Sequence, residues 1–127
     1  MSNFLIIAVL TVIGLGCGNV SARAVDLPST SKEEIDYLLA YLKNSGCQFN
    51  RNGKWYNADE AVSHIDAKYN YLIKKEMLSS TEDFIDKAAT KSSMSGKSYL
   101  VQCGNEAPAP SSLWFMEELA RYRSGKR

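Results

Sequence analysis

Hydrophobic residues recur at helical spacing in four stretches of the chain. The first stretch places them at intervals of three and four residues, on one face of a helix: Ile35, Leu38, Leu39 and Leu42. Ser31 and Glu34 have the spacing of a capping box, which predicts that this helix begins at Ser31. Gly46 predicts its end, because glycine readily adopts the left-handed conformation that closes a helix.

The same periodicity predicts three further helices. Asn57 and Ser80 each carry a side-chain oxygen that can cap the stretch that follows. The helix after Asn57 is expected to bury Ala61, Val62, Ile65, Tyr69, Leu72 and Ile73. The helix after Ser80 is expected to bury Phe84, Ile85, Ala88 and Ala89. A last helix, from about Ser112 to Tyr122, presents Leu113, Trp114, Met116, Leu119 and Ala120.

Three short segments between these helices are predicted to be strands. Residues 47–49 and 54–56 flank Arg51-Asn52-Gly53, and Asn-Gly is the strongest local signal for a hairpin. Residues 99–103 form the third strand. The resulting order is helix, strand, strand, helix, helix, strand, helix. It predicts a small single α+β domain, with about four helices packed on a short sheet made of a β-hairpin plus one C-terminal strand.

The first residues differ in character from the rest of the chain. The run from Phe4 to Gly16 is uncharged and mostly apolar, too short for a bilayer span of about 20 residues but suited to a signal peptide. Ala22 and Ala24 supply the small residues that signal peptidase reads, so we expect residues 1–24 to be removed and the mature protein to be periplasmic. Alternatively, Gly16-Cys17 resembles a lipobox, which would anchor a lipoprotein through Cys17.

Cleavage after Ala24 leaves enough chain for one small domain, with no transmembrane span expected. Residues 25–31 contain a proline and polar side chains and are predicted to be a disordered lead. The domain itself is expected to comprise residues 32–123. Residues 124–127 are predicted to be a frayed tail, as chain ends commonly are.

The charges of the chain nearly balance, with 15 Lys and Arg against 14 Asp and Glu and a net charge of +1. This balance gives no general attraction to nucleic acid, so we expect no nucleic-acid partner. One histidine and no C-x-x-C spacing argue against a metal site, and no cofactor motif is present.

Cys47 and Cys103 remain once residues 1–24 are removed, an even pair in an oxidising compartment. A disulfide between them would tie the hairpin to the C-terminal strand. The alternative is a pair of buried free thiols. Bridging so long a loop stabilises a protein by roughly 4 kcal/mol through the entropy of the unfolded chain.

Residues 96–98 read Gly-Lys-Ser, as a phosphate-binding P-loop ends, but the rest of that motif is absent. The motif needs a glycine five positions before Gly96, where Lys91 stands instead. A P-loop also follows a strand and opens a helix, whereas this segment follows a predicted helix and precedes a predicted strand. The sequence therefore argues against nucleotide binding.

Three segments carry a resemblance to a known family: EAVSHIDAKY at 60–69, EDFIDKAATKSSMSGKSYLV at 82–101 and RNG at 51–53. They resemble the small exported bacterial proteins that include the enterobacterial YfeK protein, a family named as a domain of unknown function. The resemblance covers roughly residues 33–123. It implies a periplasmic setting and supplies neither an activity nor catalytic residues.

His64 is the single histidine of the chain and therefore the side chain best suited to act as a general base near neutral pH. On a helix it lies one turn from both Glu60 and Lys68, and a nucleophile such as Ser93 or Ser95 would have to come from another element. A surface histidine in a helical ion pair is the simpler interpretation. We therefore expect no enzyme, and keep a small envelope hydrolase that uses His64 and a loop serine as an alternative.

The polar loop before the last strand is the best candidate for a binding surface. Small exposed residues on a rigid helix–strand frame are how binding loops are built, although an ordinary connector has the same composition. The residues expected to make contact are Ser93, Ser95, Gly96, Lys97 and Tyr99. The resulting hypothesis is a periplasmic binding or inhibitory module that acts through residues 92–99 on an envelope protein or a cell-wall component. A purely structural envelope protein is a further alternative.

Overall fold

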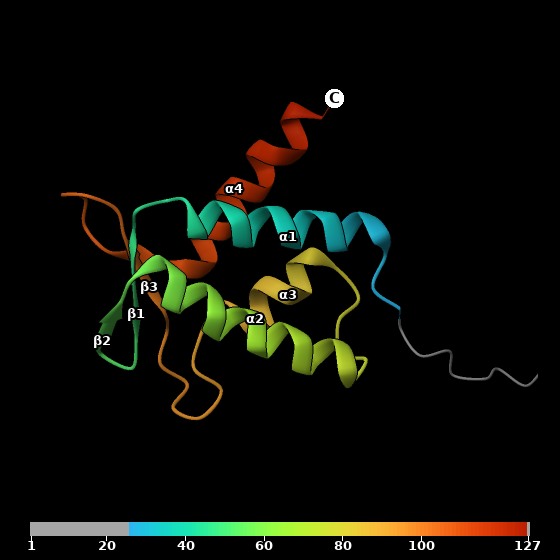
Figure 1. Ribbon diagram of the computed structural model, residues 1–127, viewed down its shortest axis with the longest axis horizontal. Helices are drawn as coiled ribbons and strands as arrows, with labels where there is room; N and C mark the ends of the chain where they lie inside the picture. The colour runs from blue at the N-terminus through green and yellow to red at the C-terminus, as the bar shows by residue number, and fades with distance from the viewer. Residues whose placement is uncertain (1–25, 127) are drawn as a thin grey trace, which may run out of the picture.

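The computed structural model describes residues 26–126. The elements of this part of the chain are α1 Ser29–Lys43, β1 Gln48–Arg51, β2 Lys54–Tyr56, α2 Ala58–Lys74, α3 Thr81–Ala88, β3 Leu100–Gln102, β4 Ala109–Pro110 and α4 Ser111–Gly125 (Figure 1). The predicted signal peptide and the alternative lipidation site at Cys17 lie outside the described residues. Between residues 26 and 126, every helix is too short or too polar to cross a bilayer.

The strands form one antiparallel sheet in the order β2-β1-β3-β4. β1 is central, since Phe49 pairs with Tyr56 of β2 on one side and with Val101 of β3 on the other. Asn52 and Gly53, both at positive φ, form the predicted turn of the hairpin. The sheet thus contains the predicted hairpin and C-terminal strand. It also contains the two-residue β4, which the sequence analysis missed because its second residue is a proline.

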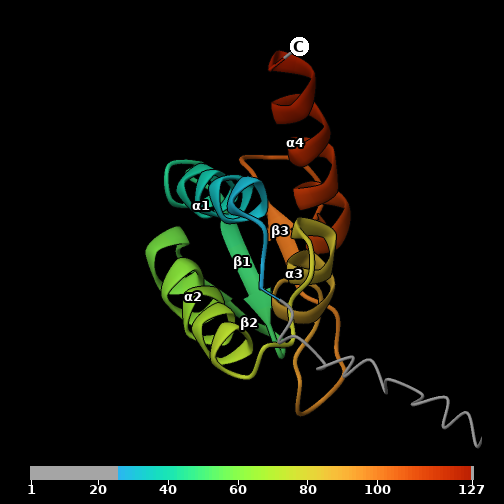
Figure 2. The same cartoon turned by 90° about the vertical axis from the view of Figure 1, so that its right-hand side faces the viewer.

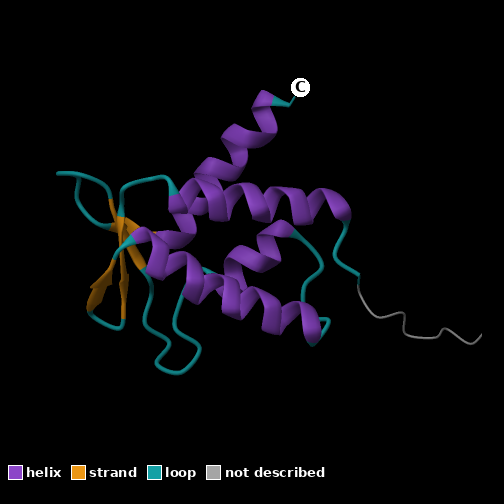
Figure 3. Ribbon diagram, in the orientation of Figure 1, coloured by secondary structure: helices purple, strands orange, loops and turns teal. Residues whose placement is uncertain are grey.

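The helices cover one face of this sheet. Figure 3 shows the strands gathered at one end of the molecule with the helices to one side of them, and Figure 2 shows the sheet behind the helices. α1 contacts each of the other three helices. The largest fully buried side chains join the two layers: Tyr99, Phe49, Phe84, Phe115, Ile35, Leu38, Leu42, Ile65, Leu78, Ile85, Leu119 and Val101. The predicted α+β domain is confirmed.

Local capping signals placed two helix starts correctly and a third incorrectly. The side chain of Asn57 accepts a hydrogen bond from the Glu60 amide, and that of Ser80 accepts one from the Asp83 amide. α1, however, begins at Ser29 rather than Ser31, with no side-chain cap. Residues 26–31 are therefore not a disordered lead throughout, because Leu27 is buried in the core and the helix already includes Ser29.

α4 differs from its prediction in both face and length. Phe115 and Leu119 are the apolar side chains that it buries, whereas Leu113 and Met116 are exposed. The helix continues to Gly125, and Lys126 contacts Glu33 of α1 at 2.5 Å. The expectation of a frayed tail from residue 124 is therefore wrong for residues 124–126, because ion pairs with the neighbouring helices hold this end.

The predicted disulfide joins Cys47 to Cys103, with 4.3 Å between the two Cα atoms. The two cysteines directly extend the register of β1 and β3, where Gln48 pairs with Gln102. Antiparallel pairing therefore brings the thiols together, as the sequence analysis expected.

Candidate functional site

The loop at residues 92–98 is closed at its base and exposed at its tip. Lys91 and Ser98 form an isolated β-bridge, and the Ser92 amide donates to the Lys97 carbonyl at 3.0 Å. The Gly96 amide donates to the Ser92 carbonyl at 2.9 Å. Gly96 has a φ of 72°, in the left-handed region that glycine adopts without strain. The result is a compact turn that presents Met94, whose side chain is 100% exposed.

A second contact fixes this loop against the hairpin turn. The hydroxyl of Ser95 donates to the side-chain oxygen of Asn52 at 2.5 Å and accepts from the Lys97 amide at 3.2 Å. The side-chain amide of Asn52 in turn donates to the Ser92 hydroxyl at 3.4 Å. Because Asn52 belongs to the tight turn between β1 and β2, two segments far apart in the sequence meet at one edge of the molecule.

The structure brings together four of the five predicted contact residues. Ser93, Ser95, Gly96 and Lys97 are all exposed in the loop. Tyr99 is not part of that surface, because its side chain is only 1% exposed and its ring packs on Phe49 with 5.1 Å between centroids. The prediction that Tyr99 contributes to a recognition surface is therefore wrong. The residue immediately precedes β3 with its side chain directed into the core.

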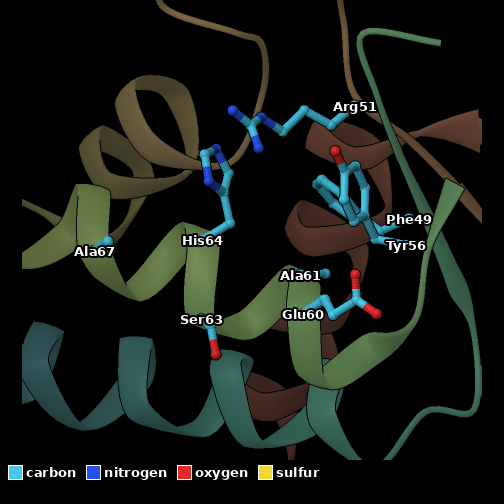
Figure 4. Close-up of a pocket in the computed structure, with 8 residues that line it drawn as sticks. All are labelled: Phe49, Arg51, Tyr56, Glu60, Ala61, Ser63, His64 and Ala67. Atoms are coloured by element: carbon cyan, nitrogen blue, oxygen red, sulfur yellow. The ribbon is translucent and has the colours of Figure 1, made fainter. Parts of the chain in front are cut away.

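The Tyr99 hydroxyl lies instead beside a group of basic side chains. The ammonium of Lys68 lies 3.3 Å from this hydroxyl and donates to the Lys91 carbonyl at 3.0 Å. Nε2 of His64 lies 3.5 Å from the same hydroxyl. Arg51, at the end of β1, is the third basic residue, and Figure 4 shows its guanidinium directed toward the His64 ring. We refer to Arg51, His64 and Lys68 as the basic cluster.

Burial and mutual repulsion perturb the titration of the basic cluster. Burial lowers the pKa of His64 below its usual value, and the charges of Arg51 and Lys68 lower it further. Burial likewise lowers the pKa of Lys68, with Arg51 adding to the effect. Burial raises the pKa of Tyr99, while the nearby Arg51 opposes that rise. Burial and the neighbouring charges therefore favour the neutral form of His64, which can accept a proton or a hydrogen bond.

A cavity of about 460 Å³ lies beside the basic cluster, between the hairpin and α2. Its walls come from β1, β2 and α2: Phe49, Arg51, Tyr56, Glu60, Ala61, Ser63, His64 and Ala67 (Figure 4). A second cavity of about 260 Å³ shares His64 and Ala67 with the first and reaches Lys68 and Ser93 at the base of the loop. Sites for small molecules typically have a volume of this order and a mostly apolar lining with a few polar groups.

The side-chain hydrogen-bond partner of His64 in the described part of the chain is a tyrosine. Ser63 lines the first cavity and Ser93 the second, yet neither contributes a hydrogen bond to His64 within the described residues. Its polar neighbour is the Tyr99 hydroxyl, and the charges that perturb it are positive. In a hydrolase with a serine nucleophile, the histidine lies within hydrogen-bond reach of that serine, and a third group orients its ring. Between residues 26 and 126, moreover, His, Cys, Asp and Glu side chains form no group of three that could hold a metal ion.

The sequence analysis identified the spacing of His64 and Lys68 on one helix but missed the basic cluster. Arg51 belongs to the RNG segment that predicted the hairpin, so its side chain was not considered as part of a site. Two signals were available: Arg51 and Lys68 are both basic, and His64 lies one helical turn from Lys68. Only the packing of the hairpin on α2 shows that they meet.

The chain was compared with families and proteins already known. Residues 29–123 match a family described as "Family of unknown function (DUF5329)". A curated relative, "Uncharacterized protein YfeK" of Salmonella typhimurium (strain LT2), is 39% identical over 62 residues. This segment covers 49% of the chain and 50% of the relative, so the match spans about half the length of each. No solved structure matches the chain. These matches confirm the resemblance inferred from the sequence, and the protein belongs to the DUF5329 family of unknown function.

Proposed function

We propose that the protein is a small binding or inhibitory module of the bacterial cell envelope, exported to the periplasm, that acts without catalysis through the loop at residues 92–98. One observation carries this proposal: the side chain of Met94 is fully exposed at the tip of a loop whose base is held by a β-bridge. A methionine adapts its shape to an apolar partner surface, and its full exposure has no role in the fold of the free protein. Lys97 adds a flexible cation beside it.

Order in the free loop favours binding. The bridge between Lys91 and Ser98 and the contact of Ser95 with Asn52 hold the loop before a partner arrives. A binding loop that is already ordered loses less conformational entropy on association. Ser95 thus serves as an anchor of the loop, and the side chains left free for a partner are those of Ser93, Met94 and Lys97. The expected partner is an envelope protein or a cell-wall component.

The test is a capture experiment from periplasmic extract that compares three forms of the protein by quantitative mass spectrometry. The loop variant is Met94→Ser with Lys97→Ala, which leaves the Ser95 anchor in place. The control variant, Met77→Ser with Lys74→Ala, removes an exposed methionine and an exposed lysine from the end of α2 and the turn after it. Both variants should keep wild-type stability, because exposed substitutions usually change it by less than about 0.5 kcal/mol.

The expected result is a species that the wild type and the control variant both retain and that the loop variant loses by about tenfold or more, a loss typical of interface contacts. A partner retained equally by all three forms would place the recognition surface elsewhere. If no species is enriched over a mock bait, the interpretation as a purely structural envelope protein is favoured. Hydrolysis that depends on His64 and Ser93 would instead support the enzyme alternative.

A further inference from the structure

The positive charges of the basic cluster have no carboxylate partner within the described residues. The ion pairs between residues 26 and 126 involve the acidic residues Glu33, Glu34, Glu82, Asp83 and Glu118, and none of them includes Arg51 or Lys68. Nε of Arg51 is moreover buried and lacks a hydrogen-bond partner in this part of the chain. Buried donors are normally satisfied by a hydrogen-bond acceptor, so an unpaired one is unfavourable. Arg51, which lines the cavity, thus has neither a carboxylate partner nor a full set of hydrogen bonds within the described residues.

The cavity has a charge of the opposite sign away from the cluster. Glu60 lines the same cavity, and Figure 4 shows its carboxylate lying apart from the guanidinium of Arg51, on the other side of the rings of Phe49 and Tyr56. Within the described residues Glu60 takes part in no ion pair. In Figure 4 the aromatic rings of Phe49 and Tyr56 lie between the two charges, and Ala61 and Ala67 add further apolar groups to the lining. Arg51 and Glu60 therefore present charges of opposite sign to one cavity, with an aromatic wall between them.

We propose that this cavity binds a short peptide by its two termini, with the C-terminal carboxylate held by Arg51 and His64 and the N-terminal ammonium facing Glu60. Guanidinium binds a carboxylate through two parallel hydrogen bonds, which gives both strength and orientation. The carboxylate would also supply the counter-charge that Arg51 lacks within the described residues. The site is distinct from the loop surface, because none of the residues lining this cavity belongs to residues 92–98.

The charge pattern selects a zwitterion of some length over a simple anion. A dianion such as phosphate would be attracted by the basic cluster but repelled by Glu60. In a free amino acid the two charged groups are attached to one carbon, whereas an extended chain reaches about 3.3–3.6 Å per residue. A dipeptide separates its termini by about 7 Å, so its two charged groups can bind different side chains of the cavity. Its side chains would lie against the apolar wall.

His64 provides a direct measurement, because the chain contains one histidine. Its ring protons give a single set of NMR signals that can be followed while the purified protein is titrated with Ala-Phe. Three probes complete the series: Ala-Phe amide, which lacks the carboxylate; N-acetyl-Ala-Phe, which lacks the ammonium; and inorganic phosphate. We expect saturable shifts with Ala-Phe, weaker binding by about tenfold or more for each blocked form, and no saturation by phosphate.

Two variants test which side chain binds which terminus of the peptide. Arg51→Gln should weaken Ala-Phe and N-acetyl-Ala-Phe alike, by about tenfold, because both present a carboxylate. Glu60→Gln should weaken Ala-Phe alone and leave N-acetyl-Ala-Phe unchanged. Ligand binding should also raise the apparent pKa of His64 in the wild type, since an anion beside the ring favours its protonated form.

Three results would overturn the proposal: equal affinity for Ala-Phe and its amide, tighter binding of phosphate than of any dipeptide, or no saturable shift of His64 with any probe. Circular dichroism shows whether Arg51→Gln still folds. If it does not, Glu60→Gln and the blocked peptides decide the matter on their own, because loss of the preference for a free ammonium in Glu60→Gln is specific to this orientation.

Discussion

Replacing Cys47 and Cys103 together by serine tests how much of the stability of the domain depends on the disulfide. The bridge lies beside the register in which β1 pairs with β3, so the two strands keep their remaining backbone pairing when it is absent. Cys47 is also buried among core residues, but serine is close to cysteine in size. The double variant therefore removes mainly the covalent link and leaves no unpaired thiol.

The magnitude follows from the length of chain that the bridge closes. The two cysteines are separated by 56 positions, and a loop of this length restricts the unfolded chain by about 4 kcal/mol at 25 °C. Small domains have a total stability of only about 5–15 kcal/mol, so the loss is a large part of it. Because 1 kcal/mol corresponds to about 4–8 °C for a domain of this size, the melting temperature should fall by roughly 16–32 °C.

The assay is thermal unfolding followed by circular dichroism, with urea unfolding at 25 °C as the second measurement. The wild type under strong reducing agent is the matched control and should unfold as the double variant does, while the variant itself should not respond to the reductant. A loss below about 1 kcal/mol would refute the chain-entropy reasoning. Two alkylatable thiols in oxidised wild-type protein would show that the bridge does not form.

Two further predictions concern charged groups. Arg123 donates to Glu34 at 2.7 Å and also contacts Glu82, lowering the pKa of both carboxyls below 4.5. Arg123→Ala should therefore cost about 1–2 kcal/mol in urea unfolding at pH 7. Because the carboxyl pKa values are lowered on folding, this contribution is present above pH 4.5 and should vanish as the pH falls through the folded values; an equal cost at pH 3 would contradict the assignment. The pKa of His64, measured by NMR, should lie below 6.5 and rise in Arg51→Gln without reaching 6.5, because burial is the larger cause. Stability should correspondingly decrease as the pH falls from above 6.5 through that folded pKa, and a wild-type value at or above 6.5 would show that the ring is neither buried nor repelled.

The features that the sequence determined by itself are those settled within a few residues of the chain. Asn57 and Ser80 cap helices because each side chain reaches an amide three positions on. Asn52-Gly53 turns the hairpin because both residues accept the positive φ that the turn needs. The disulfide could be inferred because the prediction that residues 1–24 are removed leaves two cysteines, which allow one pairing. The α+β class follows from these local elements and their order.

Hydrophobic spacing did not predict the buried face of a helix that carries apolar residues on more than one side. α4 carries apolar side chains on several sides, and its contacts with α1 and α3 selected Phe115 and Leu119 for burial while Leu113 and Met116 remained exposed. The end of this helix is likewise ordered by a partner far away in the sequence, Glu33. Neither the buried face of α4 nor the order of its C-terminal end can be predicted from the sequence of the helix alone, because both depend on the elements that pack against it.

The candidate sites depended on tertiary structure to an even greater degree. The sequence placed a polar loop at residues 92–98 and a lone histidine on a helix, and both are where it predicted. Tyr99 turned inward because the residue before β3 faces the core, and Ser95 became an anchor because the hairpin turn brings Asn52 beside it. The basic cluster and its cavity exist only where the hairpin packs on α2, since chain neighbours cannot bring Arg51 to His64. Local rules fixed the elements of this protein, and contacts between distant segments decided which of its side chains are free to bind.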